Sequence, residues 1–153
     1  MDKRILDYWN RLLSWPLGKS LFSWFLGLRV PYSGSLRPDV LQLERGFARV
    51  RMRDRWAVRN HLGSIHAAAL MNLAEAASGL AFLSVLPTDA RGIVKRFSIE
   101  YVKKGRGTLI AESQCEAPQS NEQKEYSVQA VIRDYSQDIV AVGTSTWLVG
   151  PKK

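Results

Sequence analysis

The segment from His66 to Leu86 constrains this chain more than any other, because it is almost continuously apolar and contains no proline before Pro87. It is rich in alanine and leucine, which favour helix. A helix that is apolar on all sides must be covered on all sides, and a flat sheet cannot do that. We therefore expect a long central helix with a sheet curled around it.

Strand-like segments flank this helix on both sides. Two of them precede it and are joined by a turn at Arg45-Gly46, and four follow it, where apolar residues recur with a period of two between turn signals. We interpret the last four as a meander of successive antiparallel strands, which gives an α+β fold. The expected strands are residues 40–44, 47–53, 93–104, 108–117, 125–134 and 139–149.

The first 28 residues are rich in leucine and tryptophan, and Trp15-Pro16 divides them into two short helices. A loop rich in proline, glycine and serine follows at 31–38. We therefore expect an N-terminal helical extension over residues 1–34 and a main domain over 35–153.

The aromatic residues of this extension have two interpretations. They cover the main core, or they lie at a membrane interface together with nearby basic residues. We favour the cover and expect no membrane contact. The basic residues in question are Lys3, Arg4, Arg11 and Lys19.

Composition sets broad limits on the function. A length of 153 residues fits one domain, and a net charge of +8 favours polyanionic partners. Cys115 is the only cysteine, so no intrachain disulfide can form and a cytoplasmic location is the default. Charges and Pro16 interrupt the apolar N-terminus, which argues against a signal peptide or a membrane span.

Glu75 is the only ionisable side chain between His66 and Asp89, and it lies in the middle of the expected helix. Burying a carboxylate without partners is costly, and such a group usually has a raised pKa that suits a general base or a nucleophile. Alternatively, Glu75 belongs to a polar stripe with Asn72 and Ser78 and makes structural hydrogen bonds. The sequence leaves both interpretations open.

His66 lies at the start of the helix, where unpaired N–H groups and the positive end of the dipole point outward. The small residues Ala67 and Ala68 let a ligand carbonyl approach these groups, as an oxyanion hole requires. Alternatively, His66 caps the helix. Glu75 follows it by nine positions, or about 13.5 Å along the axis, so a site that uses both requires a homodimer.

The spacing Asn60-x-x-Gly63-x-x-His66, followed by Glu75 and Gly79, resembles the hot-dog-fold acyl-CoA thioesterases of the phenylacetate-pathway type. In that family an Asp or Glu follows the histidine by nine residues, in a helix wrapped by a curved antiparallel sheet. The expected order of elements agrees with that fold from about residue 40 to residue 149. The exact sequence of the motif is closer to a branch of the superfamily whose members mostly lack an assigned function.

The resemblance implies that Glu75 is the base or nucleophile, that Asn60 polarises the carbonyl or places water, and that His66 belongs to the catalytic loop. Alanines stand where the family has helix-start glycines, and their methyl groups narrow the approach to the backbone. Ser64 is a second polar contact or part of the helix cap. The candidate oxyanion and substrate-binding residues are Gly63, Ser64, Ala67 and Ala68.

Coenzyme A carries phosphates, so basic residues near the mouth of an acyl tunnel are candidates for binding it. For the run at 103–106, a solvated hairpin turn is the alternative. The candidates are Lys95, Arg96, Lys103, Lys104 and Arg106.

The leading hypothesis is thus an acyl-CoA or acyl-carrier thioesterase, active as a homodimer, with pairing into tetramers left open. The alternative is a non-catalytic acyl-ligand-binding protein on the same fold. Nucleic-acid binding by the arginines at 49, 51, 53 and 55 lacks any accompanying motif. We expect no metal, because His61 and His66 are the only histidines, and no cofactor beyond the coenzyme A of the substrate.

Overall fold

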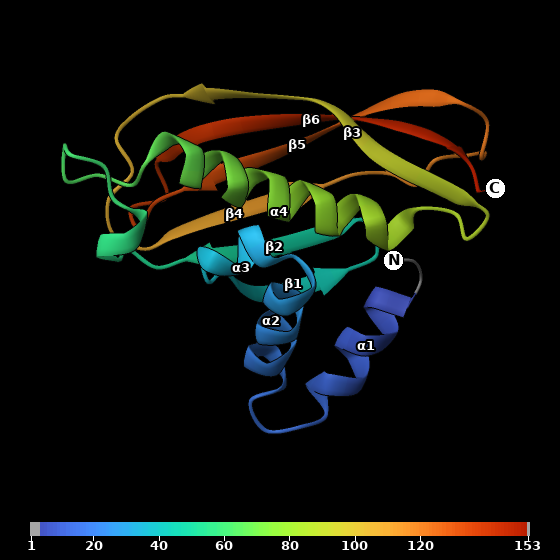
Figure 1. The fold of residues 1–153 in the computed structure, drawn as a ribbon, viewed down its shortest axis with the longest axis horizontal. Coiled ribbons are helices and arrows are strands. Elements are labelled where there is room, and N and C mark those ends of the chain that lie inside the picture. The colour runs from blue at the N-terminus through green and yellow to red at the C-terminus, as the bar shows by residue number, and fades with distance from the viewer. Residues whose placement is uncertain (1–3, 153) are drawn as a thin grey trace.

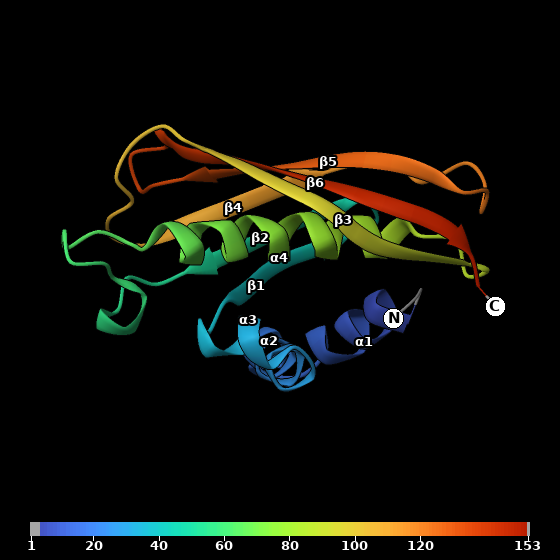
Figure 2. The same cartoon turned by 45° about the horizontal axis from the view of Figure 1, so that its top comes forward.

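The computed structural model describes residues 4–152 and shows a six-stranded antiparallel sheet curled around one long helix (Figures 1 and 2). Three shorter helices lie at the N-terminal end, and a single 3-10 turn precedes the long helix. The helices are α1 (Arg4–Leu13), α2 (Gly18–Arg29), α3 (Pro31–Ser35), the 3-10 turn η1 (Trp56–Val58) and α4 (Ala67–Val85). The strands are β1 (Asp39–Glu44), β2 (Phe47–Met52), β3 (Ala90–Tyr101), β4 (Leu109–Gln114), β5 (Lys124–Arg133) and β6 (Ile139–Pro151).

The sheet order is β1-β2-β4-β5-β6-β3, so the expected four-strand meander is wrong for its first strand. β3 pairs with β6 at the far edge, and β4 pairs with β2. β2 and β3 run in the same direction, because each step between them is antiparallel, and α4 is the crossover that joins them. This order places α4 across the concave face of the whole sheet.

The central helix agrees with its prediction at both ends, since α4 begins one residue after His66 and ends at Val85. Most of its side chains are buried against the sheet. Gly143 on β6 allows the closest approach, because a Cβ there would lie 2.6 Å from the Cβ of Ala74. One side of α4 stays open: Met71 is exposed and Glu75 is only partly buried.

The N-terminal helices form a lobe that projects from the β1 side of the domain (Figures 1 and 2). Ile5, Trp9 and Phe22 are buried there, and the rings of Trp9 and Phe22 meet edge to face at 5.0 Å. The backbone N–H of Val40 on β1 donates to the hydroxyl of Ser23, 2.8 Å away. These residues therefore form the expected cover, and Lys3 lies outside the described residues.

The loop expected at 31–38 is in part helical, which corrects the sequence interpretation. α3 covers Pro31–Ser35 and has Pro31 at its first position, where a missing N–H costs nothing and the fixed φ suits a helix. Among the described helices, α4 alone is long and apolar enough to cross a membrane, and 72% of that stretch is buried inside the fold. It is therefore the core helix of this domain.

Candidate active site

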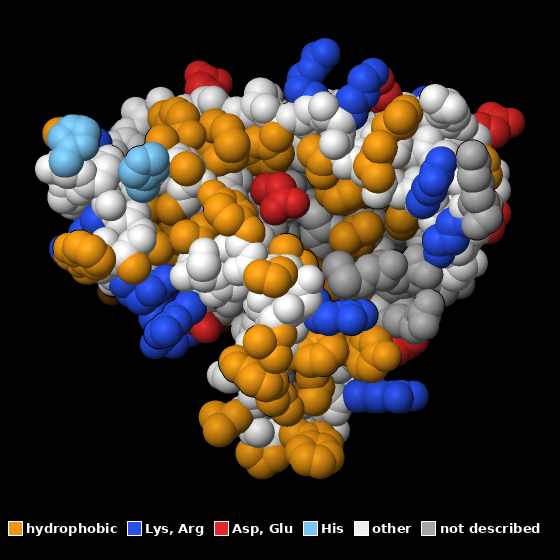
Figure 3. Space-filling model, viewed as in Figure 1, with side chains coloured by type: hydrophobic (Ala, Val, Ile, Leu, Met, Phe, Trp, Pro, Cys, Tyr) orange, Lys and Arg blue, Asp and Glu red, His pale blue; other side chains and the backbone are white. Residues whose placement is uncertain are grey.

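The carboxylate of Glu75 is partly buried and has no partner. No hydrogen bond or ion pair joins it to any described residue, and burial raises its pKa above the usual range for glutamate. Figure 3 shows one acidic side chain over α4 surrounded by apolar ones, and Glu75 is the only acid in that helix. A carboxylate in this setting is a better proton acceptor than an ion-paired one, because no neighbouring cation lowers its pKa.

The polar neighbours of Glu75 on α4 behave differently, because each is used by the fold. The Asn72 amide donates to the hydroxyl of Ser33 on α3 at 3.0 Å. The Ser78 hydroxyl donates to the backbone carbonyl of Glu75 and accepts from Ser145 at 3.1 Å. The structural interpretation thus applies to Asn72 and Ser78, and it does not apply to the Glu75 carboxylate.

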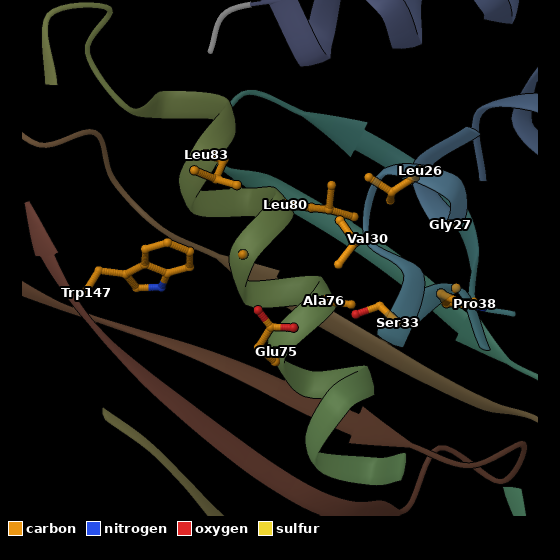
Figure 4. A pocket seen from close by; sticks show the side chains of 12 residues that line it. Leu26, Gly27, Val30, Ser33, Pro38, Glu75, Ala76, Leu80, Leu83 and Trp147 are labelled. Atoms are coloured by element: carbon orange, nitrogen blue, oxygen red, sulfur yellow. The ribbon is translucent and has the colours of Figure 1, made fainter. Parts of the chain in front are cut away.

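Glu75 faces a small apolar pocket with a volume of about 90 Å³, between α4 and the N-terminal helices (Figure 4). Leu80 and Leu83 of α4 line one wall, and the buried ring of Trp147 on β6 closes one side. The indole N–H of Trp147 donates to Ser145 at 3.0 Å, which fixes the ring. The opposite wall comes from α2, α3 and the residues beside them, namely Leu26, Gly27, Val30, Ser33, Gly34 and Pro38.

The sequence interpretation missed these wall residues. Their apolar character marks them as packing residues, but no pattern along the chain says that Trp147 and Leu26 meet across α4. The pocket lining includes neither Asn60 nor His66. Within one chain, the structure therefore keeps the predicted loop residues apart from Glu75.

Asn60 organises the loop before α4. Its side-chain oxygen accepts from the N–H of Leu62 at 2.9 Å, and from both the N–H and the hydroxyl of Ser64 at 3.2 Å. Ser64 is buried and Gly63 adopts φ +66°, so both belong to the turn itself. The Asn60 Nδ2 group makes no hydrogen bond to the described residues, which leaves it free to donate to a ligand.

His66 is the N-cap of α4, and its Nδ1 accepts from the N–H of Ala68 at 3.1 Å. The N–H groups of Ala69 and Leu70 bond to the His66 carbonyl. Only the N–H of Ala67 has no partner among the described residues in this first turn. The contacts of His66 thus agree with the capping interpretation. The N–H of Ala67 is the one backbone donor that stays available for the predicted oxyanion hole within the described residues.

Of the candidate phosphate-binding residues, two are paired with acids: Lys95 with Glu125, and Lys103 with Asp134 and Asp138. The turn at residues 103–107 lies against the loop at residues 60–66, since the N–H of Ile65 donates to the carbonyl of Gly105 at 2.8 Å. Lys104 and Arg106 flank this contact, are exposed and form no ion pair with a described residue. Arg96 is exposed on β3.

Other chemistries find less support in the described residues. Burial raises the pKa of Cys115 to about 11, so its thiol stays protonated and is a poor nucleophile. No group of three or more His, Cys, Asp or Glu side chains gathers within residues 4–152. The basic face of β2 is largely neutralised, because Arg49 pairs with Glu112 while Arg51 and Arg53 pair with Asp39.

Comparison with known families gives one match. The model of the domain of unknown function DUF4442 matches residues 18–149, a range that begins with α2, includes α4 and strands β1 to β5, and ends two residues before the end of β6. The chain belongs to this family. Comparison with curated protein sequences gives no match.

Solved structures show that this DUF4442 protein has the hot-dog fold. The structural-genomics target APC5556 is 26% identical, with a TM-score of 0.83 and coverage of 98% of both chains. A Pseudomonas aeruginosa protein of unknown function, named a probable thioesterase, is 23% identical with a TM-score of 0.78, over 90% of this chain and 98% of the other. A thioesterase family protein from Silicibacter pomeroyi is 16% identical with a TM-score of 0.72, over 85% and 96%.

The hot-dog fold implied by the resemblance is thus confirmed for this DUF4442 protein, while the thioesterase activity and its phenylacetate-pathway type stay predictions. The expected α+β architecture is confirmed as well. The assigned roles of Glu75, Asn60 and His66 are tested by none of these likenesses, so their case rests on the geometry described above.

Proposed function

We propose that this protein hydrolyses acyl thioesters, with acyl-CoA as the substrate class and Glu75 as general base or nucleophile. The observation that carries this proposal is the unpartnered, partly buried Glu75 carboxylate at the edge of an apolar pocket. A thioester offers an apolar acyl chain for the pocket and an electrophilic carbonyl for the carboxylate. The thioesterase names of structural neighbours support the same reaction.

In the proposed reaction, Glu75 takes a proton from water while the hydroxyl oxygen adds to the thioester carbonyl. The resulting oxyanion accepts hydrogen bonds from the N–H of Ala67 and from Nδ2 of Asn60, neither of which has a partner among the described residues. The C–S bond then breaks, and the leaving thiolate takes the proton from Glu75. If Glu75 instead attacks the carbonyl itself, the thiolate leaves and a mixed anhydride forms, which water then opens at the Glu75 carbon. A single turnover in ¹⁸O-water then labels Glu75 and gives a product acid without ¹⁸O, whereas the general-base route puts one ¹⁸O into the product acid.

The site is completed by a second subunit, because Asn60 and Ala67 lie at one end of α4 and Glu75 lies in its middle. We propose a homodimer in which the loop of one subunit faces Glu75 of the other. β3 offers a long open edge with Ile93 and Val94 exposed on it, and such edges pair readily with another chain.

Lys104 and Arg106 are the proposed contacts for the phosphates of coenzyme A. Neither forms an ion pair within residues 4–152, and both adjoin the loop that would hold the thioester carbonyl. The ion pairs of Lys95 and Lys103 make them weaker candidates, since a phosphate would have to displace a carboxylate. The expected location is the cytoplasm, where acyl-CoA is made and used.

Thiol release from a panel of acyl-CoAs tests the proposal directly. We expect Glu75→Gln to lower kcat/KM by about 100-fold or more, because the amide cannot accept the proton. Glu122→Gln is the matched control, since Glu122 is exposed and lies outside the pocket. Equal activity of wild type and Glu75→Gln would rule out this role for the carboxylate.

Subunit complementation tests the composite site. Glu75→Gln and Asn60→Ala each inactivate a homodimer, but a mixed dimer contains one intact site, so an equal mixture recovers about a quarter of wild-type activity. No recovery after subunit exchange, with mixed dimers verified by mass, would place both groups in sites of a single chain.

The second candidate function is acyl-ligand binding without turnover, and one contact favours it. His66 occupies the N–H of Ala68, which would otherwise be a second oxyanion donor. Acyl-CoA would then raise the melting temperature of the protein while no chain length released thiol. That result would move the function from hydrolysis to binding.

A further inference from the structure

The projecting N-terminal lobe carries an apolar surface that the fold does not use. Phe22 and Leu26 of α2 face the body of the protein, and the other side of the same helix is also apolar. Leu17, Leu21, Trp24 and Leu28 are exposed by 81%, 44%, 62% and 58%. Leu17 is the N-cap of α2, and helical spacing places Leu21, Trp24 and Leu28 on one face of the helix that follows it. We call these four residues the outer stripe.

Further exposed aromatic side chains surround the outer stripe. Trp15 lies in the connection between α1 and α2, and Tyr8 meets Phe25 with ring centroids 6.5 Å apart. Ten of the 18 large apolar residues exposed in the described structure lie between Tyr8 and Tyr32. The exposed apolar surface is therefore concentrated on one lobe, as the lower part of Figure 3 shows.

From Tyr8 to Pro38, the charged residues of the lobe are all basic. No Asp or Glu occurs between Asp7 and Asp39, and this interval contains four basic residues. All four are exposed, and none forms an ion pair with a described residue. They are Arg11, Lys19, Arg29 and Arg37. In contrast, Arg49 and Arg51 on β2, and Arg53 directly after it, are all paired.

We infer that the outer stripe and the bases around it dock this protein on an anionic lipid surface. Tryptophan and tyrosine suit the boundary between head groups and acyl chains, leucines reach below it, and unpaired Lys and Arg side chains meet anionic head groups. Docking of a second copy through the same lobe would bring together eight basic residues that form no ion pair with a described residue, so like charges oppose it. The sequence alone favoured a simple cover over the core, and only the buried side of the lobe serves that purpose.

The docking surface adjoins the candidate active site. α2 presents Trp24 and Leu28 outward, while Leu26 and Gly27 of the same helix line the pocket at Glu75. The lobe also lies on the β1 side, away from the open β3 edge proposed for dimerisation. If the proposed function holds, substrates with long acyl chains reach the pocket from the lipid surface, but lipid docking itself does not depend on hydrolysis.

Vesicle co-sedimentation of the full chain tests this inference. We expect strong binding to vesicles of phosphatidylcholine with 30% phosphatidylglycerol, roughly tenfold weaker binding to pure phosphatidylcholine, and loss of binding with rising salt. Tryptophan emission should shift to the blue on binding. Failure of the wild-type protein to bind anionic vesicles at low salt overturns the inference, whether or not the protein hydrolyses acyl-CoA.

Matched variants locate the surface. Trp24→Ser with Leu28→Ser, and separately Lys19→Glu with Arg29→Glu, should each reduce partition onto anionic vesicles by about tenfold or more. Trp56→Ser controls for the loss of an exposed tryptophan, since Trp56 is 89% exposed on η1. Arg45→Glu with Arg91→Glu controls for the same change in net charge. Both controls should bind like wild type.

Two further outcomes overturn the assignment. Equal binding by the lobe variants and the controls would show that the overall charge of +8, and not the lobe, attracts the vesicles. If Trp24→Ser with Leu28→Ser lowers the mass of the particle in light scattering and leaves vesicle binding unchanged, the outer stripe is a protein interface. Unchanged melting temperatures of the variants verify that the comparison is between folded proteins.

Discussion

The start and the middle of α4 differ in how their polar groups are satisfied. In the loop before the helix, the side-chain oxygen of Asn60 accepts three hydrogen bonds and the His66 imidazole caps the backbone. In the middle, the Glu75 carboxylate has no partner among the described residues and lies beside an apolar pocket. Hydrogen bonds within the loop hold its polar groups, so these residues have a structural role. Burying the Glu75 carboxylate without a partner lowers the stability of the fold, which makes Glu75 the stronger functional candidate.

Substituting Asn60 tests the loop side of this comparison and has the largest expected effect. Asn60→Asp keeps the acceptor oxygen that holds the turn and removes the free Nδ2 donor. We expect kcat/KM for acyl-CoA to fall by about 100-fold while the melting temperature stays near wild type. Asn60→Ala removes both atoms, so it should lose similar activity and also about 1–3 kcal/mol of stability.

Thiol-release kinetics and urea unfolding separate these two effects. Full activity of Asn60→Asp would show that Asn60 only builds the turn. In that case the Ala67 N–H would be the single oxyanion donor left in the loop.

His66→Gly tests whether the cap blocks an oxyanion donor. Glycine is an acceptable N-cap that costs only a few tenths of a kcal/mol, and it removes the imidazole that accepts from Ala68. With that N–H free, we expect kcat/KM to rise by up to about tenfold. A fall of the same size, measured at constant stability, would instead mean that the imidazole takes part in the reaction.

Much of this comparison was visible in the sequence. The apolar run predicted α4 to within a residue or two, and the lone acid in it marked Glu75 as a candidate whose role stays a prediction. The turn around Asn60 also had a signal, because Asn followed by Gly three residues later suits a side chain that bonds its own backbone. Local patterns of this kind depend on residues that are neighbours in the chain.

Long-range arrangement was less accessible. Period-two patterns predicted the strands but not that β3 pairs with β6, because alternation says which face is buried and not which strand lies alongside. The sequence did not predict the pocket walls for the same reason, because Trp147 and Leu26 are far apart in the chain and are apolar like any core residue. The sequence shows that α2 is apolar on two opposite sides, but only the fold shows which of the two sides is covered.

The pH dependence of activity and stability sharpens the contrast at Glu75. Because burial raises its pKa, the acid limb of kcat/KM should lie above the usual value for glutamate, about 4.3. Between that value and the raised pKa, the native state binds more protons than the unfolded state, so the contribution of Glu75 to stability falls as pH rises. Urea unfolding from pH 4 to 7 should therefore show Glu75→Gln gaining stability relative to wild type. A constant difference over this range would contradict the raised pKa.

The smallest expected effect concerns the helix that walls the pocket. Ser33 of α3 accepts from Asn72 of α4, and this is the hydrogen bond that ties the two walls together beside Glu75. Ser33→Ala should lower the free energy of unfolding by about 1 kcal/mol, because the Asn72 amide loses its acceptor in a mostly buried position. Ser35→Ala is the matched control on the same helix, since its hydroxyl bonds only to the exposed carbonyl of Tyr32. If the wall holds the acyl chain, Ser33→Ala also raises KM for long-chain acyl-CoA more than for acetyl-CoA, whereas an equal change for both would separate α3 from the acyl pocket.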